Sequence, residues 1–241
     1  MEESGLWELG WNNHTIPDPR LWNRSSQEGF GFAGDGDPFV PSDVSFGLRM
    51  VITVVYLLVC AMGLLGNGLV MYLIRTHKIR PTPAINVFVF GLAAADFQFS
   101  LTLPFWATET ALDFSWTFGP AMCKVIPSLT VLCVYANVFL LTVMSVTRYW
   151  SVASAIKDSS RMTARGATWI TLALWVLAVG AAVPTAIYTT VVDVAGVELC
   201  LFKFPTPSLL GVYQLQRVVF TFVVPLAIIL TSYLLLLRFL R

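Results

Sequence analysis

Four long stretches of the chain contain no charged residue and are rich in apolar side chains. A helix needs about 20 apolar residues to cross the hydrocarbon of a bilayer, because it rises only about 1.5 Å per residue. A fifth stretch, Pro81–Thr108, is interrupted only by Asp96. The four uncharged stretches, each of 20 to 27 residues, are Val51–Ile74, Val125–Thr147, Gly166–Val192 and Val218–Leu237.

We therefore expect an all-α integral membrane protein with five transmembrane helices. Composition agrees, because hydrophobic residues make up 56% of the 241-residue chain and charged residues only 12%, about half of the roughly 25% of a soluble domain. The near balance of 15 basic and 14 acidic residues excludes a basic nucleic-acid-binding protein, so no nucleic-acid partner is expected. The helices are expected near residues 48–75, 82–110, 120–150, 165–192 and 208–240.

The charges between these stretches predict the orientation. The segments that follow the first, third and fifth stretches hold nine basic residues and one acid, whereas the opposite side holds six basic residues and twelve acids. Loops rich in Lys and Arg stay on the cytoplasmic side, so we expect an extracellular N-terminus and a cytoplasmic C-terminus. Arg75, Lys78 and Arg80 in the first inner loop are expected to hold anionic membrane lipid.

Residues 1–47 are expected to form a flexible extracellular tail, because they are rich in Gly, Pro, Asp and Ser and show no apolar period. The tail lacks the basic and apolar regions of a cleavable signal peptide, so the first helix is expected to direct membrane insertion. Two N-x-[ST] sequons in the tail predict glycosylation of Asn13 and Asn23.

The four cysteines fall into two environments. Cys60 and Cys133 lie inside apolar stretches and are interpreted as small apolar residues. Cys123 and Cys200 lie outside the stretches, on the oxidising side of the membrane. We expect a disulfide between them that holds the loop after the fourth helix across the mouth of the bundle. The alternative is two free thiols.

Asp96 is the only ionisable residue expected at mid-membrane depth, where a charge is costly and usually functional. Asn67 on the first helix and Asn137 on the third lie at depths from which they could reach Asp96. The three side chains would form a wet pocket for a sodium ion or for water. The alternative is a protonated Asp96 that hydrogen-bonds between helices.

No enzyme or transporter is expected. The chain has no P-loop, HExxH or GxSxG motif, and His14 and His77 lie on opposite sides of the membrane, so they cannot share a metal ion. Apart from the sodium ion at Asp96, no cofactor is expected. One intramembrane acid and no internal repeat disfavour a transporter or channel.

Short motifs occur along the chain at specific spacings. They are, in chain order, Gly66–Asn67, Leu92–Asp96, Trp116–Gly119, Cys123, Arg148–Tyr149, Trp175, Cys200, Pro225 and Tyr233. Together they resemble the motifs of class A (rhodopsin-like) G-protein-coupled receptors. Within this family, the relaxin-3 receptor branch is similar to this chain in the segments LTLPFWATETALDFSWTFGPAMCK, SVTRYWSVASAIK, VELCLFKFP and YQLQR. The resemblance covers roughly residues 48–241.

The resemblance implies a plasma-membrane receptor for a relaxin-3-like or insulin-like peptide hormone that couples to an inhibitory heterotrimeric G protein. It implies that Arg148, Tyr149 and Tyr233 take part in activation on the cytoplasmic face, and that Ile156, in the loop after the third helix, packs into the G protein. From its position alone, Arg148 has the alternative of reaching the inner lipid headgroups.

The sequence departs from the family pattern in two places. Thr147 stands where most class A receptors have an acid beside the arginine, so restraint of the inactive state is expected to be looser. The chain stops at Arg241, without the sixth and seventh spans and their CWxP and NPxxY motifs, so we expect a truncated product, a fragment or an incomplete sequence. The alternatives are a non-signalling membrane protein that associates with full-length receptors, and another class A peptide receptor.

The predicted ligand site lies at the outer rim. Thr130 occupies the position where amine receptors carry an acid, so a biogenic amine would lack a counter-ion. Three acids lie higher: Glu109, Asp113 and Glu198. Glu109 and Asp113 are four residues apart and would share one face if the second helix continued. The predicted disulfide would bring Glu198 to the same mouth.

These three acids are expected to hold a cationic peptide through guanidinium contacts. Trp106 would supply an aromatic floor for an apolar or Trp-bearing end of the peptide. Arg217 on the fifth helix could take a carboxylate or a carbonyl. The alternative is that the acids only solvate the loops.

Overall fold

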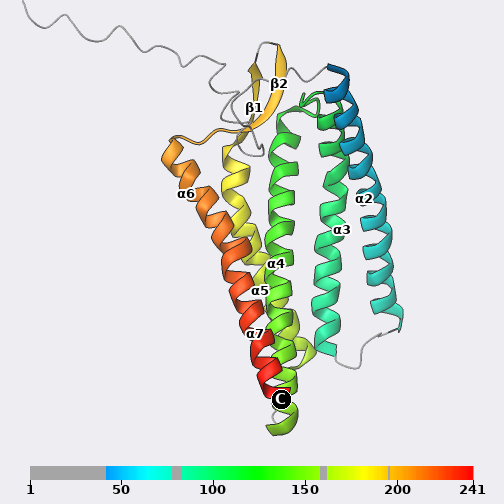
Figure 1. The fold of residues 1–241 in the computed structure, drawn as a ribbon, viewed down its shortest axis with the longest axis vertical. Coiled ribbons are helices and arrows are strands. Elements are labelled where there is room, and N and C mark those ends of the chain that lie inside the picture. The colour runs from blue at the N-terminus through cyan, green and yellow to red at the C-terminus, as the bar shows by residue number, and fades with distance from the viewer. Residues whose placement is uncertain (1–41, 78–82, 158–161, 195, 241) are drawn as a thin grey trace, which may run out of the picture. The chain divides into compact units, whose positions relative to one another are not determined.

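The computed structural model describes residues 42–77, 83–157, 162–194 and 196–240 (Figure 1). The glycosylation sites predicted at Asn13 and Asn23, and the lipid contacts predicted for Lys78 and Arg80, lie outside the described residues. Within the described part, five helical crossings are long and apolar enough to span a membrane, as the sequence predicts.

The first four crossings are single helices, and the fifth is continued through a turn of π-helix. Pro225 lies just after this turn and has no backbone N–H to give to the preceding turn of a regular α-helix, which favours the wider π geometry there. The helices are α2 (Ser42–His77), α3 (Pro83–Ala111), α4 (Gly119–Lys157), α5 (Ala164–Tyr188), α6 (Pro207–Val218), the π-turn η1 (Val219–Val223) and α7 (Val224–Leu240).

The expected fourth helix is shorter than predicted, and a β-hairpin follows it. The α5 helix ends at Tyr188 rather than near residue 192, and strand β1 (Thr189–Val194) pairs antiparallel with β2 (Val197–Phe202). The run Thr-Thr-Val-Val is β-branched throughout and so favours a strand. Gly196 in the connecting turn has a φ of +82°, which glycine adopts at little cost.

Helix α4 lies at the centre of the bundle and packs against α3, α5 and α7 (Figure 1). One buried cluster joins Ala95 of α3, Ala136 of α4 and Ala178 of α5. Small residues let the backbones approach closely, which is how helices associate in a membrane. A second cluster packs the large side chains of Phe88 and Leu140 further along the same helices.

Helix α2 runs along α3. The Thr53 hydroxyl lies 3.3 Å from the Ala107 carbonyl oxygen, and the Arg75 guanidinium lies 5.2 Å from the centre of the Phe90 ring. Gly63 directly faces Ser100, so an added Cβ would collide with that hydroxyl. These contacts link α2 to α3 at three levels, whereas most of the α2 side chains are exposed.

Candidate functional site

Trp116, in the loop between α3 and α4, is the buried centre of one end of the bundle. Its side chain is fully buried, and its indole N–H donates to the Gly119 carbonyl oxygen at 2.9 Å. Its backbone N–H donates to the Glu198 carbonyl oxygen of β2 at 2.7 Å. Its ring centre lies 6.3 Å from that of Trp106 on α3. Trp116 therefore connects α3, α4 and the hairpin.

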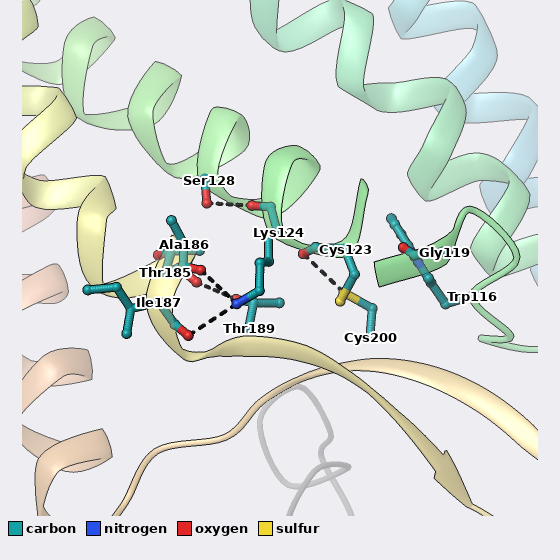
Figure 2. Close-up of a disulfide and its surroundings, with 10 residues drawn as sticks. All are labelled: Trp116, Gly119, Cys123, Lys124, Ser128, Thr185, Ala186, Ile187, Thr189 and Cys200. Atoms are coloured by element: carbon teal, nitrogen blue, oxygen red, sulfur yellow. Dashed lines mark hydrogen bonds between the residues drawn. A yellow bond between two sulfur atoms is a disulfide. The ribbon is translucent and has the colours of Figure 1, made fainter. Parts of the chain in front are cut away.

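The expected disulfide joins Cys123, at the start of α4, to Cys200 of β2 (Figure 2). The two Cα atoms are 5.6 Å apart. Both sulfur-bearing residues pack beside Trp116 in one apolar cluster. The bridge therefore holds β2, and Glu198 two residues before Cys200, over the same end of the bundle.

Lys124 is a further link at this end that the sequence did not suggest. Its ammonium group donates to the carbonyl oxygens of Ala186 and Ile187, at 3.2 and 3.4 Å (Figure 2). These are among the last carbonyls of α5, which lack partners within the helix. A cation at this end also interacts favourably with the helix dipole. Lys124 thus caps α5 where the chain turns into the hairpin.

The three acids expected at the mouth do not all lie as predicted. Helix α3 ends at Ala111, so Asp113 does not share a helical face with Glu109. Asp113 and Phe114 have φ values of 58° and 63°, a left-handed conformation that Asp tolerates better than most residues. The Phe114 N–H donates back to the Glu109 carbonyl oxygen at 2.8 Å, which closes the turn.

The acids also differ in their partners. The Asp113 carboxylate forms an ion pair with the Arg49 guanidinium of α2. Glu109 is half-buried near the end of α3, and Glu198 is exposed on the hairpin. Within the described part of the chain, no basic side chain lies within ion-pair distance of either glutamate. Among the described residues, Glu109 and Glu198 therefore have no ion-pair partner, whereas the Asp113 carboxylate is neutralised by Arg49.

Trp106 and Thr130 lie together below the loop that carries Trp116. The Trp106 indole N–H donates to the Thr130 hydroxyl at 3.1 Å. The Thr130 hydroxyl donates to the Ile126 carbonyl oxygen at 2.9 Å and lies 3.3 Å from the Thr102 hydroxyl. The indole N–H is thus occupied, whereas the ring remains half-buried. The ring of Trp106 is therefore the part that can contact a ligand.

Arg217 lies half-buried on α6, on the other side of the bundle end. The nearby Tyr213 hydroxyl lies 2.6 Å from the Thr185 hydroxyl. The buried hydroxyl of Tyr135 on α4 has no hydrogen-bond partner among the described residues. Sequence reasoning missed Tyr135, because a tyrosine inside an apolar stretch gives no signal of its own.

Arg49 was missed as well, although the sequence carries a signal for it. It is a basic residue within the expected first span, 48–75, on the predicted outer side. A basic residue at the edge of a span commonly extends its charge to water. The sequence alone therefore does not indicate that Arg49 has a specific partner within the protein. The acid it pairs with follows a different helix, and only the fold brings the two together.

At mid-helix depth, the structure brings Asp96 and Asn137 together. The Asn137 amide donates to the Asp96 carboxylate at 2.6 Å. Asn67 instead donates to the Gly63 carbonyl oxygen of its own helix at 3.0 Å. Although both residues are described, no hydrogen bond joins Asn67 to Asp96. The amide oxygen of Asn137 is buried, with no hydrogen-bond partner in the described part of the molecule.

At the other end of the bundle, Arg148 of α4 donates to the Tyr233 hydroxyl of α7 at 3.2 Å. The Thr147 hydroxyl donates to the Met144 carbonyl oxygen of its own helix. Tyr149 follows Arg148 and is half-buried. Ile156 lies in the last turn of α4, because this helix runs on to Lys157 rather than ending near residue 150. The expected loop position of Ile156 was therefore wrong.

Comparison with known families identifies this arrangement. Residues 66–241 match the model of the seven-transmembrane receptors of the rhodopsin family. The chain belongs to the rhodopsin family. The family match and the five apolar helices show a multi-pass membrane protein and confirm the rhodopsin-like helical bundle.

Individual relatives of this rhodopsin-family chain agree with the suspected branch. It is 46% identical to the human relaxin-3 receptor 2 over 95% of this chain and 61% of the relative. It is 47% identical to the human relaxin-3 receptor 1 over 82% of this chain and 47% of the relative. Identity to the bovine somatostatin receptor type 5 is 33%, over 89% of this chain and 58% of the relative.

The higher identity to the relaxin-3 receptors confirms the resemblance to that branch. The chain spans 47 to 61% of the length of the relaxin-3 receptors that it matches.

Proposed function

We propose that the protein is a peptide-hormone receptor of the plasma membrane. It binds a relaxin-3-like or insulin-like peptide at the end that carries the hairpin, and it couples to an inhibitory heterotrimeric G protein at the opposite end. The hairpin end is extracellular and the C-terminal end of α7 is cytoplasmic in this proposal, in accord with the distribution of charge along the chain.

The observation that carries the proposal is the hydrogen bond between the Trp116 N–H and the Glu198 carbonyl oxygen, at 2.7 Å. It sets Glu198, which has no ion-pair partner among the described residues, directly beside a buried tryptophan. The ring centre of that tryptophan lies 6.3 Å from that of Trp106. A mouth with acids above and aromatic rings below suits a peptide that carries basic side chains and an aromatic end. The relatives' name, relaxin-3 receptor, agrees with a peptide ligand.

Charge and burial at the mouth suggest separate roles. Glu109 is half-buried, so a guanidinium bound there would be partly desolvated; Glu198 is exposed and suits the first attraction of a cationic ligand. Losing one partner of a desolvated charge pair costs about 2–5 kcal/mol, whereas a rim pair is worth far less. Arg217, half-buried on α6, offers a cation for a carboxylate or carbonyl group of the same peptide.

On the cytoplasmic side, we assign Arg148, Tyr149 and Tyr233 to activation, and Ile156 to the surface that receives the G protein. The hydrogen bond from Arg148 to Tyr233 links α4 to α7, so the guanidinium already reaches across the bundle. Ile156 lies on the last turn of α4, beyond Arg148. Arg75 is exposed at the same end, next to Phe90, where it is available to anionic lipid.

We also propose a sodium ion beside Asp96. A small hard cation binds oxygen ligands, and the Asp96 carboxylate lies next to Asn137, whose buried amide oxygen has no partner among the described groups. These two side chains fit a cation or a water molecule that contacts both oxygens. Asn67 fits less well than the sequence suggests, because its amide is bonded to its own helix.

The test is binding of labelled relaxin-3 to cells that express the full-length receptor, meaning this chain with any sequence that precedes or follows it. We expect saturable binding and a ligand-dependent fall in cAMP. Glu198→Gln should weaken binding about two- to fivefold, because an exposed ion pair contributes at most about 1 kcal/mol. No saturable binding of relaxin-3 or a related insulin-like peptide to the wild-type receptor would contradict the proposal.

The hairpin offers a matched control for this experiment. Asp193 lies opposite Glu198 in the strand register and is also exposed. Its carboxylate accepts a hydrogen bond from the Gly196 N–H at 3.0 Å, and an asparagine can keep that bond. Asp193→Asn therefore removes one negative charge from the same hairpin. An equal loss of affinity in both variants would show that peptide binding depends on the overall negative charge of the mouth and not on a specific contact with Glu198.

A further inference from the structure

Arg49 and Asp113 form an ion pair at the proposed mouth. Arg49 lies on the first turns of α2, and Asp113 lies in the turn after α3. The Arg49 side chain is 20% exposed, whereas that of Asp113 is 76% exposed. The guanidinium therefore lies largely within the protein and presents its charge to a carboxylate at the surface.

The backbone holds the two groups in place. Positive φ values at Asp113 and Phe114 turn the chain back, and the Phe114 N–H donates to the Glu109 carbonyl oxygen. On the other side, the Thr53 hydroxyl donates to the Arg49 carbonyl oxygen at 2.8 Å and lies 3.3 Å from that of Ala107. The outer ends of α2 and α3 are thus fixed to each other beside the pair.

Among the described residues, Asp113 is the ion-pair partner of the Arg49 guanidinium. Its Nε–H is buried and has no hydrogen-bond acceptor in the described part of the chain. Glu109 and Glu198, the two other acids of the mouth, have no basic partner among the described residues. Arg49 therefore neutralises one acid of the mouth, Asp113, and leaves Glu109 and Glu198 without a basic partner among the described residues.

We propose that Arg49 determines specificity by occupying Asp113 with an internal guanidinium. This inference rests on the proposed function, because it concerns the same ligand site. A basic side chain of the peptide reaches Asp113 only by displacing Arg49, whereas Glu109 and Glu198 are open to it. The mouth therefore offers two anionic positions to a ligand rather than three.

The effect of this ion pair on peptide affinity can be separated from the general effect of positive charge at the mouth. Any cation near the mouth repels a basic peptide, and removing it strengthens binding somewhat through the weaker repulsion. Lys203 serves as a comparison, because it is an exposed cation just after β2. Removing Lys203 changes the net charge of this end as much as removing Arg49 does. Only removal of Arg49 also uncovers a carboxylate.

The experiment measures the affinity of labelled relaxin-3 for the full-length receptor and its variants at physiological salt. We expect Arg49→Gln to bind about two- to fivefold tighter than wild type, the range that a partly exposed ion pair allows. Arg49→Lys, which keeps the charge, should bind like wild type. Lys203→Gln should change affinity less than twofold. In a receptor that carries Asp113→Asn, Arg49→Gln should have no larger effect than Lys203→Gln.

Three outcomes would overturn the inference. They are unchanged or weaker binding by Arg49→Gln, an equal gain from Lys203→Gln, and a gain from Arg49→Gln that persists in full beside Asp113→Asn. If Arg49→Gln fails to reach the cell surface, Arg49→Met, which keeps the apolar stem, undergoes the same comparison. Absence of relaxin-3 binding to wild type overturns the proposed function together with this inference, whereas wild-type binding with one of the three outcomes overturns this inference alone.

Discussion

Arg148 and Tyr233 face each other across the bundle, with the guanidinium donating to the tyrosine hydroxyl at 3.2 Å. Arg148 lies on α4 and Tyr233 on α7, so the contact connects two crossings that are far apart in sequence. The residue before Arg148 is Thr147, whose hydroxyl is bonded to its own helix. Thr147 therefore supplies no carboxylate to compete with Tyr233 for the Arg148 guanidinium.

We expect Arg148→Ala to abolish coupling in the full-length receptor. The substitution removes the charge proposed to meet the G protein, together with the link to α7, but leaves the buried clusters of α4 intact. The measurement is the ligand-dependent fall in cAMP, with surface expression as the control for folding. Normal coupling by Arg148→Ala at wild-type surface levels would contradict the assignment.

Tyr233→Phe separates the two roles of the arginine. It removes only the hydroxyl that accepts the hydrogen bond from Arg148. We expect weaker coupling that is not abolished, because the guanidinium remains available. A Tyr233→Phe receptor that signals like wild type would show that the contact with α7 does not contribute.

Substitution of Asp96 tests the proposed sodium site. We expect Asp96→Asn to abolish the effect of sodium on binding of an agonist peptide, because the amide lacks the charge that attracts the cation. Asn137→Ala should reduce the effect strongly, since the Asn137 amide contacts Asp96 directly. Sodium sensitivity that is unchanged in Asp96→Asn would exclude a cation there.

Asn67→Ala is the matched comparison for this experiment. Asn67 was grouped with Asp96 from its depth alone, but its amide donates to the Gly63 carbonyl oxygen. We expect Asn67→Ala to preserve most of the sodium effect. An effect as large as that of Asn137→Ala would instead support the three-residue pocket.

The five crossings were predictable because membrane spans depend on length and apolarity, which sequence records directly. The disulfide was predictable too, because only Cys123 and Cys200 lie outside the apolar stretches. The hairpin was not, since Thr189–Val192 is uncharged and continues the apolar pattern of α5. In that stretch, β-branched residues favour a strand, while hydropathy does not distinguish strand from helix.

The ligand site itself stays a prediction, but the arrangement of its acids differs from the one that the sequence suggests. The four-residue spacing of Glu109 and Asp113 implied a common face only if α3 continued. The helix ends at Ala111, and left-handed conformations at Asp113 and Phe114 redirect the chain. The pair with Arg49 depends on contact between separate helices, which one sequence does not reveal.

Lys124 offers a test of how the hairpin is supported. We expect Lys124→Met to lower the stability of the receptor by about 0.3–1 kcal/mol, the usual contribution of a cation at a helix C-terminus. Its ammonium group donates to the Ala186 and Ile187 carbonyl oxygens, where α5 gives way to β1. The measurement is the temperature at which detergent-solubilised receptor loses peptide binding. Lys124→Arg should retain most of the stability, and equal loss in both variants would contradict capping by charge.

Trp116 tests the centre of the proposed mouth. Trp116→Phe keeps an apolar ring but removes the indole N–H that donates to the carbonyl oxygen of the half-buried Gly119 at 2.9 Å. A typical hydrogen bond contributes about 0.5–1.5 kcal/mol, so we expect lower thermal stability and weaker peptide binding. The same denaturation assay measures the first effect. Wild-type stability of Trp116→Phe would show that this hydrogen bond is dispensable.

Glu109 and Glu198 should respond differently to salt. Exposed charges are screened over about 8–10 Å at physiological ionic strength, whereas partly buried pairs are screened much less. Glu198 is exposed and Glu109 is half-buried. We therefore expect Glu109→Gln to weaken relaxin-3 binding about tenfold or more at both low and high salt. The loss in Glu198→Gln should shrink as salt rises, and the loss in Asp113→Asn should be smaller than either, because Arg49 already neutralises that carboxylate. Affinities measured across a salt series test this prediction. Equal losses of affinity in all three variants at every salt concentration would exclude distinct roles for these acids.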